Sequence, residues 1–214
     1  MYFKILGRYL SAGKSVLEYG AGYGYLSKRI SQKFDSFAYD ISKHSRNKIR
    51  DVSPKTQVLE KLSQIKKHKF DGIICLHTLE HINDPAETVK LFNESLNSKG
   101  VVVAVMPDTE GMGHKIKKDN WFAYKDKTHI SLLGGEEWVN IFKKEGFTVI
   151  KTGSDWFWDP PYLPLIPVLL QKLIFFPGCL VMVVLGRIIY PQGWGEDLVI
   201  VDKLFSPKLP CPIS

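Results

Sequence analysis

The chain has 214 residues, of which 44% are hydrophobic and 24% are charged, and these values exclude disordered, collagen-like and coiled-coil proteins. Its formal net charge of +7 is compatible with nucleic acid, an anionic membrane or an acidic ligand as a partner, and it selects none of them. The three cysteines, Cys75, Cys179 and Cys211, are too far apart for a disulfide framework or a zinc knuckle, which favours a reducing cytoplasm.

The first half of the chain alternates between helical and extended patterns. A short amphipathic helix is predicted over residues 2–10, and strands and helices then follow each other up to residue 107. The predicted strands are 15–19, 36–39, 56–59, 70–76 and 101–107, and the predicted helices are 25–33, 42–51 and 84–96. This alternation predicts an α/β fold with a mostly parallel sheet and helices on both of its faces.

The second half is predicted to complete the same domain. We expect a helix at 134–144, a sixth strand at 147–150 and a seventh at 198–201. The chain is therefore interpreted as one domain, with a first half (1–107) and a substrate-side half (108–214).

An apolar insert, about 161–190, separates the last two predicted strands. Lys172 and Arg187 limit its uncharged part to about 14 residues, whereas a membrane span needs about 20. Three interpretations remain: a buried cap, which the length favours, an element lying on a membrane surface, and a transmembrane helix.

A glycine-rich turn follows the first predicted strand and precedes the first long helix. Gly20, Gly22 and Gly24 are spaced differently from a dinucleotide-binding fingerprint, and Glu18 precedes them. A carboxylate at this position would repel a pyrophosphate but accept hydrogen bonds from an ammonium group. Asp40 ends the second strand, where a carboxylate can bind both hydroxyls of a ribose. The pattern therefore predicts a nucleoside that carries an amino acid.

These residues resemble the class I S-adenosylmethionine-dependent methyltransferases. Residues 16–24 (VLEYGAGYG) are similar to the first motif of that family, and residues 70–107 are similar to its fourth and fifth strands. The segment LEHI at 79–82 is typical of the branch with quinone-biosynthesis and other small-molecule methyltransferases. The resemblance continues through 126–130 and 195–201. It implies a Rossmann-like sheet of seven strands, with the last strand antiparallel and the apolar insert between strands six and seven.

The resemblance also implies a cofactor, S-adenosylmethionine, a product, S-adenosylhomocysteine, and no metal. The residues around the methionine part would be Glu18, Gly20, Ala21, Gly22 and Gly24. Asp40 would bind the ribose, Ile41 would lie on the adenine, and Glu60 would contact its amino group. Leu76 and His77 would line the channel from which the methyl group emerges.

Methyl transfer to oxygen or nitrogen is accelerated by holding the acceptor close and by a base that titrates near neutral pH. His129 and His77 are the candidate catalytic bases, because both follow segments expected near the site. The candidate acceptor-binding residues are His81, Trp121, Tyr124 and Asp126.

The sequence favours a methyltransferase that acts on oxygen or nitrogen of a small molecule, sugar or lipid-like acceptor. The alternatives are an RNA methyltransferase, which only the net charge favours, and a cofactor-binding protein without turnover. We expect a cytoplasmic protein, with peripheral contact to a membrane left open by the apolar insert. Nucleic acid is not the expected partner, and the oligomeric state is left open.

Overall fold

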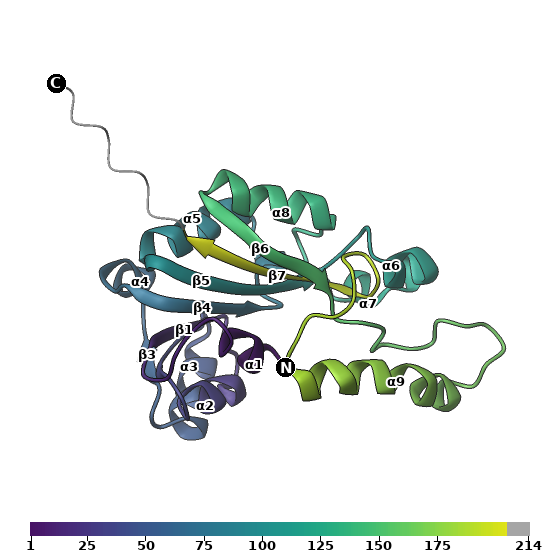
Figure 1. Cartoon of the computed structure of the whole chain (residues 1–214), viewed down its shortest axis with the longest axis horizontal. Coiled ribbons are helices and arrows are strands. Elements are labelled where there is room, and N and C mark those ends of the chain that lie inside the picture. The colour runs from purple at the N-terminus through teal and green to yellow at the C-terminus, as the bar shows by residue number, and fades with distance from the viewer. Residues whose placement is uncertain (205–214) are drawn as a thin grey trace.

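Seven strands form one sheet in the order β3-β2-β1-β4-β5-β7-β6 (Figure 1). The computed structural model describes residues 1–204, so Cys211 lies outside the described residues. The strands are β1 (Ser15–Tyr19), β2 (Asp35–Tyr39), β3 (Gln57–Leu59), β4 (Phe70–Leu76), β5 (Leu96–Pro107), β6 (Phe147–Ser154) and β7 (Asp197–Leu204). Strands β1 to β5 are parallel to one another, and β7 lies antiparallel between β5 and β6.

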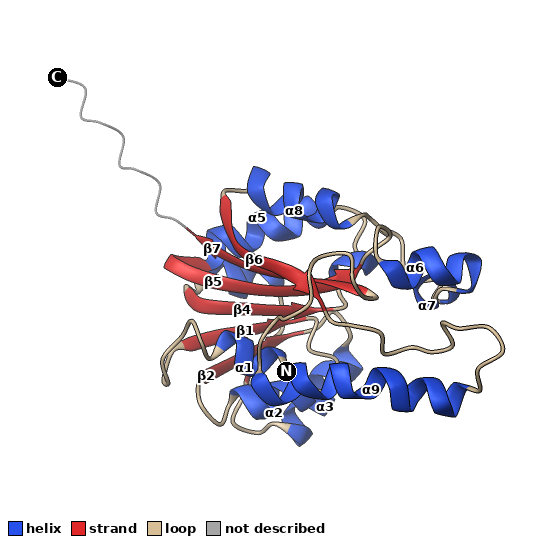
Figure 2. Ribbon diagram, turned by 45° about the vertical axis from the view of Figure 1, so that its right-hand side comes forward, coloured by secondary structure: helices blue, strands red, loops and turns tan. Residues whose placement is uncertain are grey.

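Helices cover both faces of this sheet (Figure 2). They are α1 (Tyr2–Leu6), α2 (Tyr25–Ile30), α3 (Lys43–Val52), α4 (Leu62–Lys67), α5 (Pro85–Ser95), α6 (Met112–Lys117), α7 (Phe122–Lys125), α8 (Gly135–Lys144) and α9 (Val168–Leu185). One large apolar cluster joins the sheet to α4, α5 and α8, and another joins it to α1 and α2. The core is therefore split into two layers by the sheet.

Local sequence explains where several elements begin. The Ser42 hydroxyl accepts a hydrogen bond from the Ser45 backbone at 3.3 Å and caps α3. Asp84 caps α5 in the same way, and Pro85 occupies the first turn, where no backbone N–H is needed. The inner strands are uninterrupted apolar runs because helices bury both of their faces.

The predicted seven-stranded sheet with an antiparallel last strand is confirmed, and each predicted strand is present. The strands β5, β6 and β7 extend beyond their apolar cores into polar residues, which the apolar pattern alone does not mark. Helices α4, α6 and α7, each four to six residues long, were not predicted.

The favoured interpretation of the apolar insert as a buried cap is wrong. Its main part is α9, a helix of 18 residues of which only 11% are buried. In both views α9 extends outward from the neighbourhood of the N-terminus, away from the sheet (Figures 1 and 2).

Candidate active site

The glycine turn, the end of β2 and the end of β4 lie at one edge of the sheet. Tyr19 is level with Tyr39 on one side and with Cys75 on the other, because all three strands are parallel. The residues that follow these strands are therefore brought together at their carboxyl ends, where open α/β sheets bind ligands.

The glycine turn is held against Asp40. One carboxylate oxygen of Asp40 accepts a hydrogen bond from the Gly22 backbone at 2.8 Å, and the other accepts one from Ser42 at 2.9 Å. Each oxygen keeps a second lone pair for a ligand hydroxyl. A Cβ at Gly22 would meet no protein atom within 4 Å, so bare backbone faces open space at this point.

At positions 20 and 24 the backbone conformation favours glycine, and a larger side chain would meet neighbouring atoms. The φ angles of Gly20 and Gly24 are +76° and +81°, in the left-handed region that favours glycine. A Cβ at Gly20 would also overlap the side chain of Thr78, which follows β4. Ala21, between the glycines, is buried and donates its backbone N–H to Tyr39 at 3.0 Å.

Glu18 lies beneath this turn with only 6% of its surface exposed. Burial raises the pKa of Glu18 to about 7, although the hydroxyl of Ser27 donates a hydrogen bond to the carboxylate and opposes that shift. An ammonium group brought to this carboxylate would favour its ionised form. The residue therefore fits a cationic ligand group better than an anionic one.

A cavity of about 540 Å³ opens beside the turn. Gly20, Gly22, Asp40, Ile41, His77 and His81 are among the residues that line it. Ile41 presents an exposed apolar side chain there, which suits the face of a purine ring. These residues fit the predicted nucleoside with an amino-acid tail.

Five predicted cofactor residues are not among those that line this cavity. Glu18, Ala21 and Gly24 belong to the end of β1 and the turn beside the cavity, whereas Glu60 and Leu76 lie apart from it. The carboxylate of Glu60 is 2.8 Å from Arg46 Nε and also pairs with Arg50, and Leu62 lines the cavity near that point instead. Leu76 packs partly buried against the core on the α1 side of the sheet. The structure therefore does not bring Glu60 and Leu76 to the cavity.

His77 stands at the cavity between two carboxylates. Its Nδ1 is 3.4 Å from Glu80 Oε1, and its Nε2 is 3.7 Å from Asp197 Oδ2. Its φ of +47° is unusual for a side-chain-bearing residue and turns the chain sharply after β4. Burial lowers the pKa of the imidazole, but Asp197 and Glu80 outweigh it and raise the pKa to about 9.

Asp197 connects this histidine to a second acid and an aromatic residue. It is fully buried, and its backbone N–H donates to Asp155 at 3.1 Å. The indole of Trp158 donates to Asp197 Oδ2 at 3.0 Å. Burial and the neighbouring Asp197 raise the pKa of Asp155 well above its usual value, and burial also raises the pKa of Asp197.

His129 lies behind His81 rather than at the cavity. The two imidazole rings are 4.6 Å apart between centroids, and only His81 lines the cavity. Nδ1 of His129 is 2.6 Å from the Ala123 carbonyl, and Nδ1 of His81 is 3.2 Å from the Thr128 carbonyl. Nε2 of His129 is 3.9 Å from Asp126 Oδ2, which is too far for a hydrogen bond.

Glu80, His81 and His129 offer ligand atoms within 4.8 Å of one another. Glu80 is fully buried, and its carboxylate oxygens have no hydrogen-bond partner among the described residues. Imidazole and carboxylate groups are ligands that divalent transition metals accept. These three residues could hold a metal ion, and the sequence-based expectation of a metal-free site stays a prediction.

The residues predicted to bind the acceptor differ in how exposed they are. Trp121 is fully buried, and its indole donates to Glu196 at 2.6 Å, so it is a core residue and not a stacking surface. Tyr124 is exposed, with its hydroxyl 3.0 Å from His114 Nε2. Asp126 is exposed and accepts hydrogen bonds from Thr128 in its own loop.

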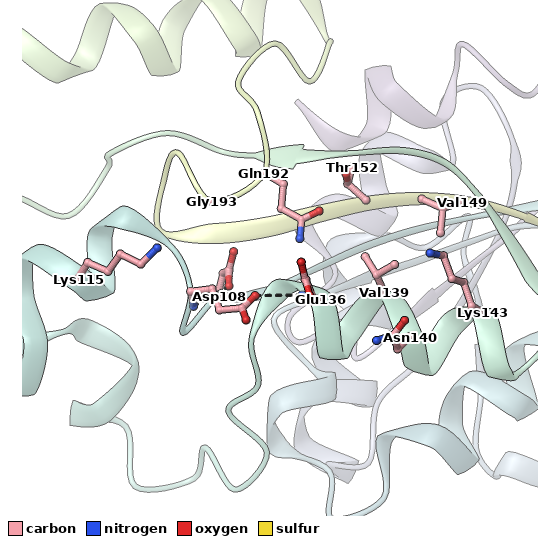
Figure 3. A pocket seen from close by; sticks show the side chains of 11 residues that line it. Asp108, Lys115, Glu136, Val139, Asn140, Lys143, Val149, Thr152, Gln192 and Gly193 are labelled. Carbon is pink, nitrogen blue, oxygen red and sulfur yellow. Dashed lines mark hydrogen bonds between the residues drawn. The ribbon is translucent and has the colours of Figure 1, made fainter.

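A larger cavity, about 740 Å³, is lined by residues of β6 and α8, of the segment that follows β5 and of the turn at 192–193 (Figure 3). Its lining mixes acids with the lysines Lys115 and Lys143. The Asp108 carboxylate there accepts hydrogen bonds from the backbone of Glu110 at 2.9 Å and of Gly135 at 2.8 Å. Asp108 thus fixes the start of α8, and the lining contains neither the glycine turn nor a histidine.

Sequence reasoning missed the acids that approach His77. Glu80 entered the sequence analysis only as part of LEHI, and Asp197 only as part of the resemblance over 195–201. Asp155 and Trp158 were not assigned to the site. Acidic residues directly beside an apolar strand were the available signal, because a carboxylate that enters a core needs a charged or hydrogen-bonding partner.

A family model described as a methyltransferase domain matches residues 3–152. The chain belongs to this methyltransferase family. A ubiquinone biosynthesis O-methyltransferase from Neisseria meningitidis is 27% identical to this chain over 101 residues. That match covers 42% of this chain and 42% of the relative, so the chain spans less than half of the curated protein that it matches.

Solved structures share the fold of the methyltransferase. One is a Thermotoga maritima enzyme described as a possible histamine N-methyltransferase, with a TM-score of 0.65 and 18% identity, covering 94% of this chain and 86% of that one. Another is an S-adenosylmethionine-dependent methyltransferase from Archaeoglobus fulgidus, with a TM-score of 0.61 and 20% identity, covering 94% and 92%. The methyltransferase is therefore of the class I, S-adenosylmethionine-dependent type.

Proposed function

We propose that this methyltransferase methylates an oxygen or nitrogen atom of a small molecule, sugar or lipid-like acceptor. The observation that carries the proposal is the position of His77, which lines the cavity beside Gly20 and Asp40 and contacts two buried carboxylates. This arrangement provides a proton acceptor at the place where an acceptor hydroxyl or amine would have to react.

The residues that line the cavity and Glu18, beneath the glycine turn beside it, divide the binding task between them. Glu18 accepts hydrogen bonds from the ammonium group of the cofactor, and Asp40 accepts them from the ribose hydroxyls. Ile41 covers one face of the adenine. When bound, S-adenosylmethionine supplies a methyl group on a positively charged sulfur, so most of the rate enhancement comes from alignment of the acceptor.

His77 takes the proton that the acceptor loses. With a pKa of about 9, His77 is mostly protonated at pH 7 in the protein without ligand, and a protonated imidazole cannot accept a proton. A cationic ligand in the same cavity repels the imidazolium and lowers its pKa toward neutrality. Asp197 and Glu80 then stabilise the imidazolium that forms when His77 accepts the proton.

An oxygen acceptor has the better support. The curated relatives are described as O-methyltransferases of ubiquinone biosynthesis, and their matched segment spans less than half of each chain. An oxygen nucleophile also has the greater need of a base, since a hydroxyl must lose its proton to be methylated. A phenol or alcohol on an apolar molecule is therefore the proposed acceptor class.

Methyl-tritiated S-adenosylmethionine would test the proposal. The purified protein is incubated with lipid, small-molecule and RNA fractions of cells, and label is followed in each. Label in the lipid or small-molecule fraction is expected. Label confined to RNA would support the alternative that the net charge of +7 favours. Tight cofactor binding without label in any fraction would indicate a cofactor-binding protein without turnover.

A further inference from the structure

Helix α9 exposes apolar side chains over most of its circumference. Its outermost row consists of residues that follow the helical repeat and are all exposed: Leu169, Leu173, Phe176, Leu180 and Val184. Leu169 is 73% exposed and Val184 is 61% exposed. A helix on the surface of a protein in water normally turns polar residues outward, so α9 has the reverse of that pattern.

The helix is nevertheless held firmly along one narrow side. Gln171 and Met182 are its buried residues. The Gln171 amide donates to the carbonyls of Leu163 at 2.9 Å and Ile166 at 2.7 Å. The indole of Trp156 donates to the Phe175 carbonyl at 3.1 Å. These contacts fix which side of α9 faces the protein, so its apolar outer side remains exposed.

One cation lies on α9, and three more lie at its C-terminal end. The stretch 160–195 contains no acidic residue but includes Lys172 and Arg187. At the end of α9, Lys4 donates to the Val183 carbonyl at 3.1 Å, and Arg8 donates to Gly186 at 2.9 Å. These cations satisfy the free carbonyls of the last turn and lie at its surface.

The connections of α9 argue against a single crossing of a membrane. The chain leaves β6 at Ser154 and returns to β7, where Leu198 pairs with Ser154. A spanning helix would need a second spanning segment for this return, because unpaired backbone does not cross a bilayer. Residues 1–204 contain no second helix that is long and apolar enough.

We propose that α9 lies in the surface of an anionic bilayer, with its apolar outer row in the acyl chains and the flanking cations at the headgroups. The helix is about 27 Å long at 1.5 Å per residue and can lie along the interface without crossing it. Anionic headgroups are the chosen partner because each nearby lysine or arginine adds about 1 kcal/mol of attraction.

This placement would also open the site toward the membrane, a step that rests on the proposed function. An apolar groove of about 360 Å³ runs between α9 and Trp158. Trp158 hydrogen-bonds to Asp197, which in turn contacts His77. The groove is thus linked to His77 by two side-chain contacts, and it faces the side from which a lipid-like acceptor would approach.

Vesicle flotation with the full chain tests the docking independently of any methyl transfer. The protein is expected to float with phosphatidylcholine vesicles that contain phosphatidylglycerol, and to float less with pure phosphatidylcholine or at high salt. The double variant Leu169→Gln/Val184→Gln keeps the charge and should partition at least about tenfold less. Met112→Gln/Ile150→Gln removes two exposed apolar side chains elsewhere and should partition as the wild type does.

Thermal unfolding should be the same for both double variants and the wild type, because all four side chains are exposed. Failure of the wild type to float, or flotation of Leu169→Gln/Val184→Gln at the wild-type level, would overturn the proposal. So would a wild-type dimer in solution that this variant separates into monomers, since a second copy would then cover the face. Vesicle binding without labelled lipid would leave the docking standing and count only against the proposed acceptor.

Discussion

His77 Nε2 lies 3.7 Å from Asp197 Oδ2, although the two residues come from opposite halves of the chain. The antiparallel direction of β7 creates this approach, because its first residue pairs with Pro107 at the end of β5. A parallel last strand would begin at the far edge of the sheet. The reversed strand therefore supplies the acid that sets the charge of the histidine at the cavity.

Replacement of His77 by asparagine should lower kcat about a hundredfold and change the affinity for S-adenosylmethionine by less than about threefold. Asparagine tolerates the positive φ at this position, so the turn after β4 is kept. Steady-state assays would measure kcat, and titration calorimetry would measure the affinity for S-adenosylmethionine.

The matched control is His129→Asn, because His129 is also within the histidine pair but does not line the cavity. We expect its kcat to stay within about tenfold of the wild-type value, a smaller loss than the roughly hundredfold loss expected when the base is removed. If the large loss follows His129→Asn and not His77→Asn, the assignment of the base is reversed.

Asp40→Asn should weaken S-adenosylmethionine binding by about tenfold or more, since a neutral amide loses the charge-assisted hydrogen bonds to the ribose. The fold should be only slightly affected, because the amide oxygen can still accept the bond from Gly22, and the Ser42 N–H that loses its acceptor is exposed to water. Titration calorimetry would measure the affinity, and an unchanged affinity would remove Asp40 from the ribose role.

Cofactor affinity should rise between about pH 6 and pH 8, because Glu18 has a pKa of about 7 and binds an ammonium group only when ionised. Below pH 7 the carboxyl is protonated, so binding must release its proton. Calorimetry in buffers of different ionisation enthalpy would detect this release. A Glu18→Gln variant should bind weakly and lose the pH dependence, and a wild-type affinity that is flat over this range would contradict the assignment.

Gly20→Ala should destabilise the fold more than Gly13→Ala does. Both positions have φ near +75°, which costs an alanine about 1–2 kcal/mol. Only at Gly20 does the new Cβ overlap another side chain, that of Thr78, which adds about 1–3 kcal/mol. Urea unfolding would compare the pair, and equal losses would show that the contact with Thr78 is relaxed without cost.

Asp202→Asn should stabilise the protein above pH 7 and have little effect below pH 4. Asp202 is fully buried in β7, and burial raises its pKa to about 7. A raised pKa favours folding at low pH, and that contribution is lost as the pH rises from the unfolded value of 3.8 through 7. Melting curves across this range would show the gain, which should be a few degrees at pH 8.

The sheet was predictable because its inner strands are apolar runs that end in glycine or acidic residues. The same pattern located Gly20, Asp40 and His77 at one edge, since parallel strands bring their carboxyl ends together. Contacts between distant segments were not predictable. The approach of Asp197 to His77 depends on strand order and direction, which no local pattern in either segment contains.

The behaviour of the apolar insert and of Trp121 shows the same limit. Hydrophobic sequence predicts that a segment avoids water, but not whether protein or another medium covers it. For α9 the apolar residues face outward, whereas Trp121 is enclosed completely with its indole bound to Glu196. The two cases differ in packing geometry and not in composition.

Ser154 pairs with Leu198 and also forms an isolated bridge to Tyr190, so the insert leaves and re-enters the hairpin through a closed neck. The insert still reaches back below this neck, because Asp155 and Trp158 hydrogen-bond to Asp197 at the start of β7. A cassette exchanged here between enzymes would therefore carry with it part of the hydrogen bonding around Asp197, so a change in this segment would be felt at His77 as well.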